Sequence, residues 1–245
     1  MKNKAIAFIC VMLSFLTFAT VNTYAQNIKG NGKIKTDIRQ VTGFNRIVVQ
    51  GQVELYLSQE TTENVKIEAE ENLIELFQTL VNDNTLYVIV PNNIKKSNKL
   101  TITIAFKELK NIILLNEVSL KTDRAVNFDE VEIICGGSSK MDFEYKASKS
   151  NVKVIDGGSV FLRGYSEELT IEAHDDAEIN AFDLQSDNCN VVGSGYSEIS
   201  VNAKKKLAIT LSGSSNLFFM GEPAISQRNF NSTGLITKRK VGTDN

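Results

Sequence analysis

The stretch Val191–Ile199 (VVGSGYSEI) decides the fold, because its pattern recurs along the chain. It has an apolar strand, then a small or glycine-containing step, and then a second short strand that closes on an apolar residue. The other copies are Ile47–Leu55 (IVVQGQVEL), Ile112–Leu120 (IILLNEVSL), Ile133–Met141 (IICGGSSKM), Val154–Leu162 (VIDGGSVFL), Ile171–Ile179 (IEAHDDAEI) and Ile209–Leu217 (ITLSGSSNL). From Ile112 onward, successive copies start 21, 21, 17, 20 and 18 residues apart.

A repeat of this length, with strands at each step, predicts an all-β solenoid with coils of about 17–21 residues. Each copy is then one coil, and equivalent residues stack about 4.8 Å apart along the axis. One coil cannot bury its apolar side alone, so stacked neighbours form a continuous core. The alternative is a β-sandwich, which would show hairpin turns every ~8–12 residues rather than one register shared by all copies.

The chain before the regular coils follows a different pattern. Val65–Ala69, Leu86–Val90 and Leu100–Phe106 read as strands, whereas Glu70–Val81 has apolar residues at helical spacing and predicts one short helix. We therefore expect a single β-helix domain over residues 26–236. Its parts are an irregular N-terminal part (26–108), regular coils (109–223) and a final strand (226–236), and a tail follows at 237–245.

Residues 1–25 have the pattern of a signal peptide. Lys2 and Lys4 precede the apolar run Ala5–Ala19, and cleavage is expected after Ala25. The run has fifteen residues, fewer than the roughly 20 needed to cross a bilayer. We expect an exported protein of the periplasm, the outer surface or the medium, with no transmembrane segment after cleavage.

Composition excludes several classes of protein. The 245 residues carry 29 acidic and 27 basic side chains, a net charge of −2, which is not the basic balance of a nucleic-acid-binding protein. One histidine leaves little room for metal sites, and no dinucleotide, phosphate-loop or Cys/His metal motif is present, so no cofactor and no metal are expected. Cys135 and Cys189 fall at different offsets of the repeat, which favours two buried free thiols.

Other residues resemble a known family. Gly30-Asn31-Gly32, Val41–Phe44, Ile47–Leu57 with Gln59, Val65–Leu73 and the later Gly-Ser steps follow the order of the auto-transporter adhesin, head GIN domain family. The resemblance covers roughly Phe44 to Arg228 and implies a right-handed parallel β-helix in the cell envelope or outside the cell. It brings no catalytic residues. Asn116-Glu117-Val118 and His174-Asp175-Asp176 depart from the family's small Gly-Ser step.

One acidic group could carry chemistry. Asp156, His174, Asp175 and Asp176 fall on adjacent coils, with Asp156 aligned to Ala173 in the repeat. Paired carboxylates of this kind could serve a polysaccharide-degrading enzyme or bind Ca²⁺. Ordinary surface acids on solvated turns explain the same pattern, so no catalytic residue is predicted.

Aromatic residues give a second candidate surface. Tyr165 and Tyr196 both follow a glycine and precede Ser-Glu, and they could stack on a sugar, although their offsets in the coil differ. Phe161, Phe182 and Phe219 are expected in the core.

These patterns favour a non-catalytic adhesin or binding module, with a glycan or another envelope component as its partner. The alternatives are a β-helix enzyme that degrades polysaccharides with surface carboxylates, and a structural envelope module that associates end to end as a homo-oligomer.

Overall fold

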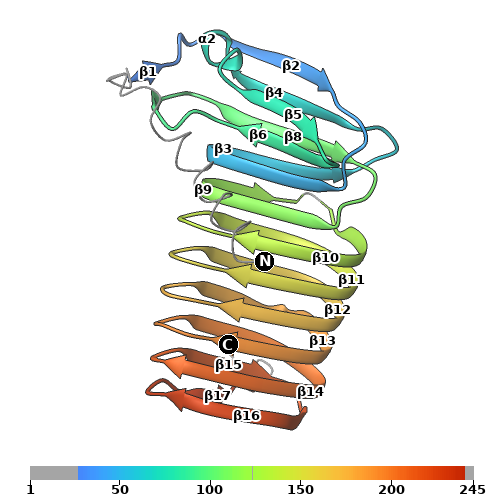
Figure 1. Ribbon diagram of the computed structural model, residues 1–245, viewed down its shortest axis with the longest axis vertical. Helices are drawn as coiled ribbons and strands as arrows, with labels where there is room; N and C mark the ends of the chain where they lie inside the picture. The colour runs from blue at the N-terminus through green and yellow to red at the C-terminus, as the bar shows by residue number, and fades with distance from the viewer. Residues whose placement is uncertain (1–26, 123, 241–245) are drawn as a thin grey trace, which may run out of the picture.

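The computed structural model describes residues 27–122 and 124–240, and they form a nearly all-β solenoid of about seven turns (Figure 1). The predicted signal peptide lies outside the described residues. The N-terminal elements are β1 (Ile28–Lys29), β2 (Ile34–Gln40), β3 (Arg46–Gln59), β4 (Asn64–Glu70), α2 (Glu71–Ile74), β5 (Gln78–Asn82), β6 (Thr85–Ile89), β7 (Ile94–Lys96) and β8 (Leu100–Phe106). The coils follow as β9 (Asn111–Lys121), β10 (Val126–Cys135), β11 (Lys140–Val154), β12 (Ser159–Ala173), β13 (Glu178–Gly193), β14 (Glu198–Gly213), β15 (Asn216–Met220), β16 (Ala224–Ser232) and β17 (Ile236–Lys238).

Parallel pairing between consecutive coils builds the stack. From β9 to β15 each strand pairs in parallel with the next, and β3 joins β9 in the same way. The inward-pointing side chains of successive coils lie directly above one another. They are buried because the next coil covers them. One such ladder contains Ile47, Ile112, Ile133, Val152, Ile171, Val191 and Ile209. The predicted β-solenoid is therefore confirmed.

The register corrects one copy of the repeat. Val152, and not Val154, pairs with Ile133 and Ile171, so that copy starts two residues earlier than the sequence alignment placed it. The spacings become 21, 19, 19, 20 and 18 residues. The turn fixes where each copy of the repeat starts, because one residue per coil takes a positive φ there. These residues are Asn116, Gly137, Asp156, Asp175, Gly195 and Gly213.

The helix predicted over Glu70–Val81 ends at Ile74, so the prediction is wrong beyond that residue. Residues 78–82 instead form β5, which pairs antiparallel with β6 through a two-residue turn. Asp83 and Asn84 in that turn both have positive φ, the conformation of a tight hairpin. Cross-strand pairing thus overrides a helical spacing of apolar residues.

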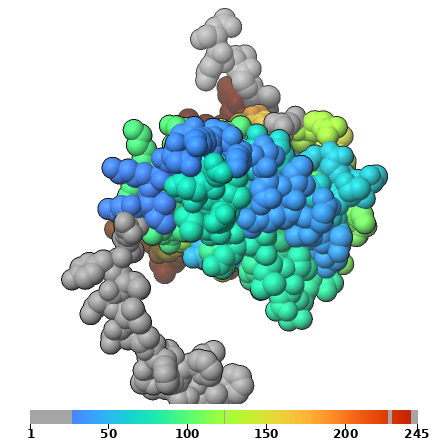
Figure 2. All heavy atoms as spheres, turned by 90° about the horizontal axis from the view of Figure 1, so that it is seen from above, coloured from blue at the N-terminus to red at the C-terminus, as the bar shows by residue number. Residues whose placement is uncertain are grey.

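Charged side chains close the N-terminal end of the stack. β2 pairs antiparallel with β4 at the edge of the sheet, and Figure 2 shows the N-terminal residues covering this end. The Arg39 guanidinium donates to the carbonyls of Phe77 (2.6 Å) and Ile74 (3.0 Å), which ties β2 to the end of α2. A charged residue on the inner side of an edge strand discourages further strand addition.

We call the N-terminal elements that close the stack, β2, β4, α2 and the β5–β6 hairpin, the cap. Glu70 is a buried carboxylate in this cap, with 1% of its surface exposed. The Ser97 hydroxyl donates to it at 2.5 Å and the Asn98 backbone N–H at 2.7 Å. Burial raises the pKa of Glu70, but these hydrogen bonds outweigh it and hold the pKa below its usual value of 4.5. The carboxylate thereby fixes the segment after β7 against β4.

The C-terminal end is open by comparison. Ile225, Phe230 and Leu235 are 48%, 43% and 65% exposed, although Ile225 and Phe230 pair with the buried Leu207 and Leu211 of the preceding coil. Within the described ranges, no helix is long and apolar enough to cross a membrane.

We expect Gly164→Ala to destabilise the fold by about 3 kcal/mol. Gly164 has a φ of +112°, and a Cβ there would lie 2.0 Å from the Tyr145 carbonyl oxygen. Urea denaturation measures the loss. Gly157→Ala is the matched control, because the nearest atom to its Cβ would be 3.9 Å away. Equal midpoints for the two variants would contradict this account.

We expect Glu70→Gln to cost about 1–3 kcal/mol at pH 7, because the hydrogen bonds to the charged carboxylate are lost. The folded pKa is lowered, so the stabilisation is complete above the unfolded pKa near 4.5 and disappears as pH falls through the folded pKa. Urea midpoints of both proteins, taken from pH 7 to pH 3, should converge at the acid end. Glu75→Gln, at an exposed carboxylate nearby, should show little difference, and a gap that persists in acid would refute the role of the charge.

Candidate functional site

The structure places the predicted acidic residues on exposed turns. Asp156 and Asp175 occupy the same positive-φ position on adjacent coils, so Asp156 stacks on Asp175 and not on Ala173 as the sequence alignment had it. Asp156, Asp175 and Asp176 are exposed to solvent. Among the described residues, no three His, Cys, Asp or Glu side chains come together in a way that could hold a metal ion.

His174 is the first residue of the turn that contains Asp175 and Asp176, because the Ala177 N–H donates to its carbonyl at 3.2 Å. Its Nδ1 is 2.7 Å from the Ser194 hydroxyl, and its Nε2 is 3.8 Å from a Glu172 carboxylate oxygen. The second distance is too long for a hydrogen bond, so the histidine is oriented by Ser194 alone. The residues that line the hollows described below do not include these three, so a substrate would meet them on an open surface.

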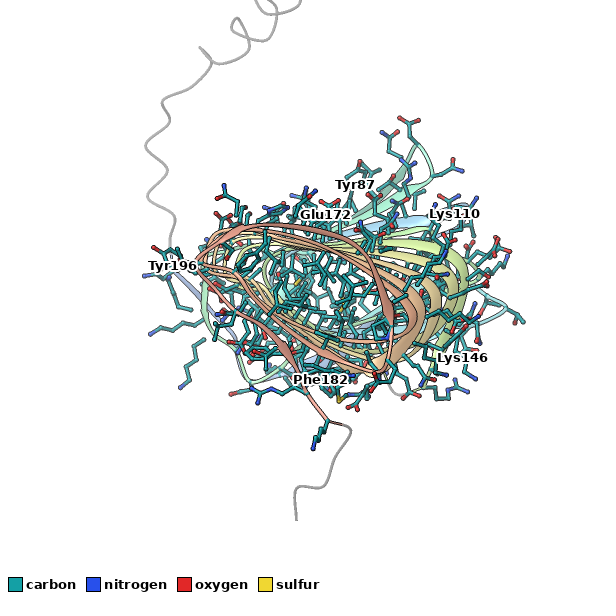
Figure 3. The ribbon with its side chains drawn as sticks, turned by 90° about the horizontal axis from the view of Figure 1, so that it is seen from below. Tyr87, Lys110, Lys146, Glu172, Phe182 and Tyr196 are labelled. Atoms are coloured by element: carbon teal, nitrogen blue, oxygen red, sulfur yellow. The ribbon has the colours of Figure 1, made fainter. Side chains whose placement is uncertain are left out.

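The two predicted tyrosines lie in different places. Tyr196 is 75% exposed and stands at the narrow turn edge of the coils (Figure 3). Tyr165 follows the bend at Gly164 and its hydroxyl bonds to Asp187, which also pairs with Lys205 at 2.7 Å. Burial and the Asp187 charge raise the pKa of Tyr165, and the hydrogen bond from Lys205 lowers the pKa of Asp187. The tyrosines do not form one stacking surface.

Two of the three phenylalanines expected in the core lie outside it. Phe219 is buried, but the Arg163 guanidinium lies 5.0 Å from the Phe161 ring centroid on the outside of the coil. Phe182 is also only partly buried and points away from the core (Figure 3). The strand alternation explains this, because Val160 and Leu162 point inward and the residue between them must point outward.

The cysteines are buried free thiols, as predicted. Burial raises the pKa of Cys135 and of Cys189 to about 12. A thiol that stays protonated at neutral pH is a poor nucleophile, so neither residue suits thiol catalysis.

A candidate binding site lies where the N-terminal part meets the first coils. A hollow of about 590 Å³ opens between the β3–β8 surface and the segment 124–127; we call it the Tyr56 hollow. Its lining is Glu54, Tyr56, Leu57, Ser58, Gln59, Glu68, Lys99, Thr101, Thr103, Arg124, Ala125, Val126 and Asn127. A second hollow of about 700 Å³ adjoins it at Gln59 and Asn127.

Backbone pairing arranges the floor of the Tyr56 hollow. Tyr56 pairs with Thr103 of β8 and with Lys121 of β9, and Glu54 pairs with Thr101, so these side chains share the outer face of the sheet. The Gln59 side chain holds the segment 124–127 beside β3. Its amide donates to the Asn127 carbonyl at 3.1 Å and accepts from the Asn127 N–H at 3.1 Å. The hollow is therefore supported by strands and by a two-way amide contact.

Three ion pairs surround Tyr56. Lys99 lies 3.2 Å from Glu68, Lys121 lies 3.5 Å from Glu54, and Arg124 lies 3.4 Å from Glu60. Hydrogen bonds from Lys66 and Lys99 lower the pKa of the Glu68 carboxyl, which keeps it charged at neutral pH. The hollow thus offers an aromatic ring, two threonine hydroxyls and charges of both signs.

Sequence reasoning missed Tyr56, although a signal was present. In VELYLSQ the buried residues are Val53, Leu55 and Leu57, so alternation places Tyr56 on the outer face. An outward aromatic between two inward leucines is the pattern that marks it. The pairing of β3 with β8, which brings the threonines beside it, has no comparable sequence signal.

Solved structures show the same fold. The chain is similar to a "putative adhesin" from Bacteroides fragilis, with 22% identity, a TM-score of 0.75, and coverage of 87% of this chain and 100% of that one. A "putative adhesin" from Parabacteroides distasonis shares 19% identity over 86% and 99% of the two chains, with a TM-score of 0.67. A "putative lipid binding protein" from the same species shares 22% over 86% and 99%, with a TM-score of 0.64.

A search of curated proteins finds no match. The family model "Putative auto-transporter adhesin, head GIN domain" matches residues 43–223, which include β3, the β5–β6 hairpin and the coils as far as β15. With most of its length matched by this model and the solenoid fold present, the chain belongs to the auto-transporter adhesin, head GIN domain family.

Proposed function

We propose that this protein is an exported, non-catalytic glycan-binding module of the cell envelope or cell surface, and that the Tyr56 hollow is its binding site. The main support for this proposal is the Tyr56 ring, which points outward between threonine hydroxyls and paired charges. A tyrosine ring offers a flat apolar face, whereas the surrounding groups can donate and accept hydrogen bonds. This combination suits a sugar ring, which has apolar C–H faces and a polar rim.

The polar lining favours a sugar over an acyl chain. Carboxylates, ammonium groups and hydroxyls line the hollow around Tyr56, and a lipid tail would remove water from these groups without offering them hydrogen bonds. The hollow's volume lies in the usual range for small-ligand sites, roughly 300–1,000 Å³. The family's adhesin name fits the same reading, since adhesion requires a surface ligand.

The enzyme alternative rests on weaker geometry. Its carboxylates, Asp156, Asp175 and Asp176, sit on exposed turns, where solvent weakens the interactions that catalysis needs. The structural alternative rests on the open C-terminal end. There the exposed apolar side chains are Ile225, Phe230 and Leu235.

We expect the chain from Gln26 onward, which contains every described strand, to bind a polysaccharide without shortening it. The probes are an uncharged glucan, a uronic-acid polymer and an amino-sugar chain, with retention measured by affinity electrophoresis and chain length by size-exclusion chromatography. Tyr56→Ala should weaken retention about tenfold or more, because the stacking face is lost.

Two variants make this test specific. Tyr56→Phe keeps the ring and should retain most of the binding, and Tyr196→Ala removes an exposed tyrosine elsewhere and should change nothing. Circular dichroism checks that each variant is folded. Shortened chains would overturn the non-catalytic assignment, and loss of binding in Tyr196→Ala but not in Tyr56→Ala would move the site to the turn edge.

A further inference from the structure

One broad face of the solenoid carries an unusual row of outward apolar side chains. Strand pairing aligns Leu80, Tyr87, Val48, Ile113 and Ile134 as successive rungs on β5, β6, β3, β9 and β10. The buried ladder of the core lies on the other side of these strands, so this row faces solvent. Leu80 is 62% exposed, and the other four are partly buried.

A second row runs beside the first. Ile89 and Leu115 both pair with Gln50. Ile155 occupies the same position two coils further along. Gly136 lies between Leu115 and Ile155, and a Cβ there would be 3.5 Å from Leu115 Cδ2 and 3.3 Å from Ile155 Cγ1. The two side chains therefore close over the glycine, whereas the polar Gln50 lies between Ile89 and Leu115 in this row. We call the eight residues of the two rows, Leu80, Tyr87, Val48, Ile113, Ile134, Ile89, Leu115 and Ile155, the apolar stripe.

The fold does not require this apolar surface. In the same register, later coils carry Lys153, Glu172, Val192 and Thr210 in the first row, and His174, Ser194 and Ser212 in the second. Those coils have the same core and the same turns. The apolar stripe is thus confined to the N-terminal half of the face, and an ion pair between Lys153 and Glu172 (3.5 Å) marks where it ends.

The dimensions of this face match those of a protein interface. The strands β5, β6, β3, β9, β10, β11, β12, β13, β14 and β16 lie about 4.8 Å apart and each contribute about five residues of length, which gives a face of about 800 Å². Roughly 300 Å² of it is the apolar stripe, and the rest is polar. A stable complex commonly buries about 800 Å² on each partner, with an apolar centre and a polar rim.

We propose that this face packs against the same face of a second copy of the chain, forming a symmetric dimer. Two β-sheets can pack face to face at about 10 Å with their side chains interleaved. Seen along the axis, the coils largely superimpose, and the part of the chain beside Tyr87 projects beyond their outline (Figure 3). Each face also presents both a lysine and a glutamate beside the apolar stripe, which allows opposite charges to meet across a two-fold axis.

This face suits contact with a second copy better than either end of the solenoid does. At the N-terminal end, Arg39 of β2 bonds to carbonyls of the cap, and the apolar side chains exposed on this strand are Ile34 and Ile38. At the C-terminal end, three large apolar side chains are exposed, Ile225, Phe230 and Leu235, against the eight residues of the apolar stripe. The first row of the apolar stripe has no charged residue over its five strands, β5, β6, β3, β9 and β10. The Tyr56 hollow uses the other half of each coil, so it stays open in the dimer.

Sedimentation velocity of the chain from Gln26 onward, over a range of concentrations, tests the proposal. We expect a monomer–dimer equilibrium that Ile113→Thr combined with Ile134→Lys weakens about tenfold or more, because two apolar side chains leave the interface. The same row already carries Thr210 and Lys153, so the coil accepts these residues. An unchanged urea midpoint verifies the fold.

Two controls separate this face from other surfaces. Phe182→Lys changes an outward apolar residue on the opposite side of the coils and should leave the dimer intact. Phe230→Lys changes the open C-terminal end and should also leave it intact. A protein that stays monomeric at all concentrations overturns the proposal. So does a dimer that survives the double variant, or one that only Phe230→Lys disrupts.

Discussion

The parallel hydrogen-bond ladder between coils is the constraint on which the rest of the structure depends. It holds each strand about 4.8 Å from the next and fixes which residues lie above one another. One positive-φ residue per coil, such as Asp175 or Gly195, sets the phase at which the chain turns back. With the phase set, inward positions become a core, and outward positions become straight rows that run along the whole molecule. Chemistry on this fold is therefore a property of rows rather than of single loops.

Those rows give the two halves of each coil different characters. One half presents an apolar surface at the N-terminal end of the stack and polar residues further along. The other half presents Tyr56 beneath the segment 124–127, where the regular coils begin. Both features lie close to the cap, where strands of both directions join the ladder. The irregular part of the chain thus does more than close the solenoid, because it shapes the surfaces on which we expect binding.

The repeat made the solenoid predictable, since apolar residues recur in step with glycine, asparagine or aspartate at the turn. The phase at Val154 was misread because Val152 and Val154 are equally apolar, and only strand pairing distinguishes them. Helical spacing over Glu70–Val81 was overridden by the Asp83-Asn84 turn, whose effect depends on β6 being available as a partner. Phe161 points outward because it lies between the inward Val160 and Leu162, and Tyr56 points outward because it lies between the inward Leu55 and Leu57. The hollow itself depends on the meeting of β3, β8 and residues 124–127, which lie far apart in the sequence.

The open C-terminal coil also determines how the molecule responds to mechanical load. Its strands β16 and β17 are held from one side only, by β14 and β15. A force that draws this end away along the solenoid axis acts on the hydrogen bonds of one coil at a time, because each coil contacts only its neighbours. Force applied across the axis would instead load many strands together. A tether at the C-terminal end would therefore make the stack yield by peeling, whereas attachment through its broad faces would make it resist as a block.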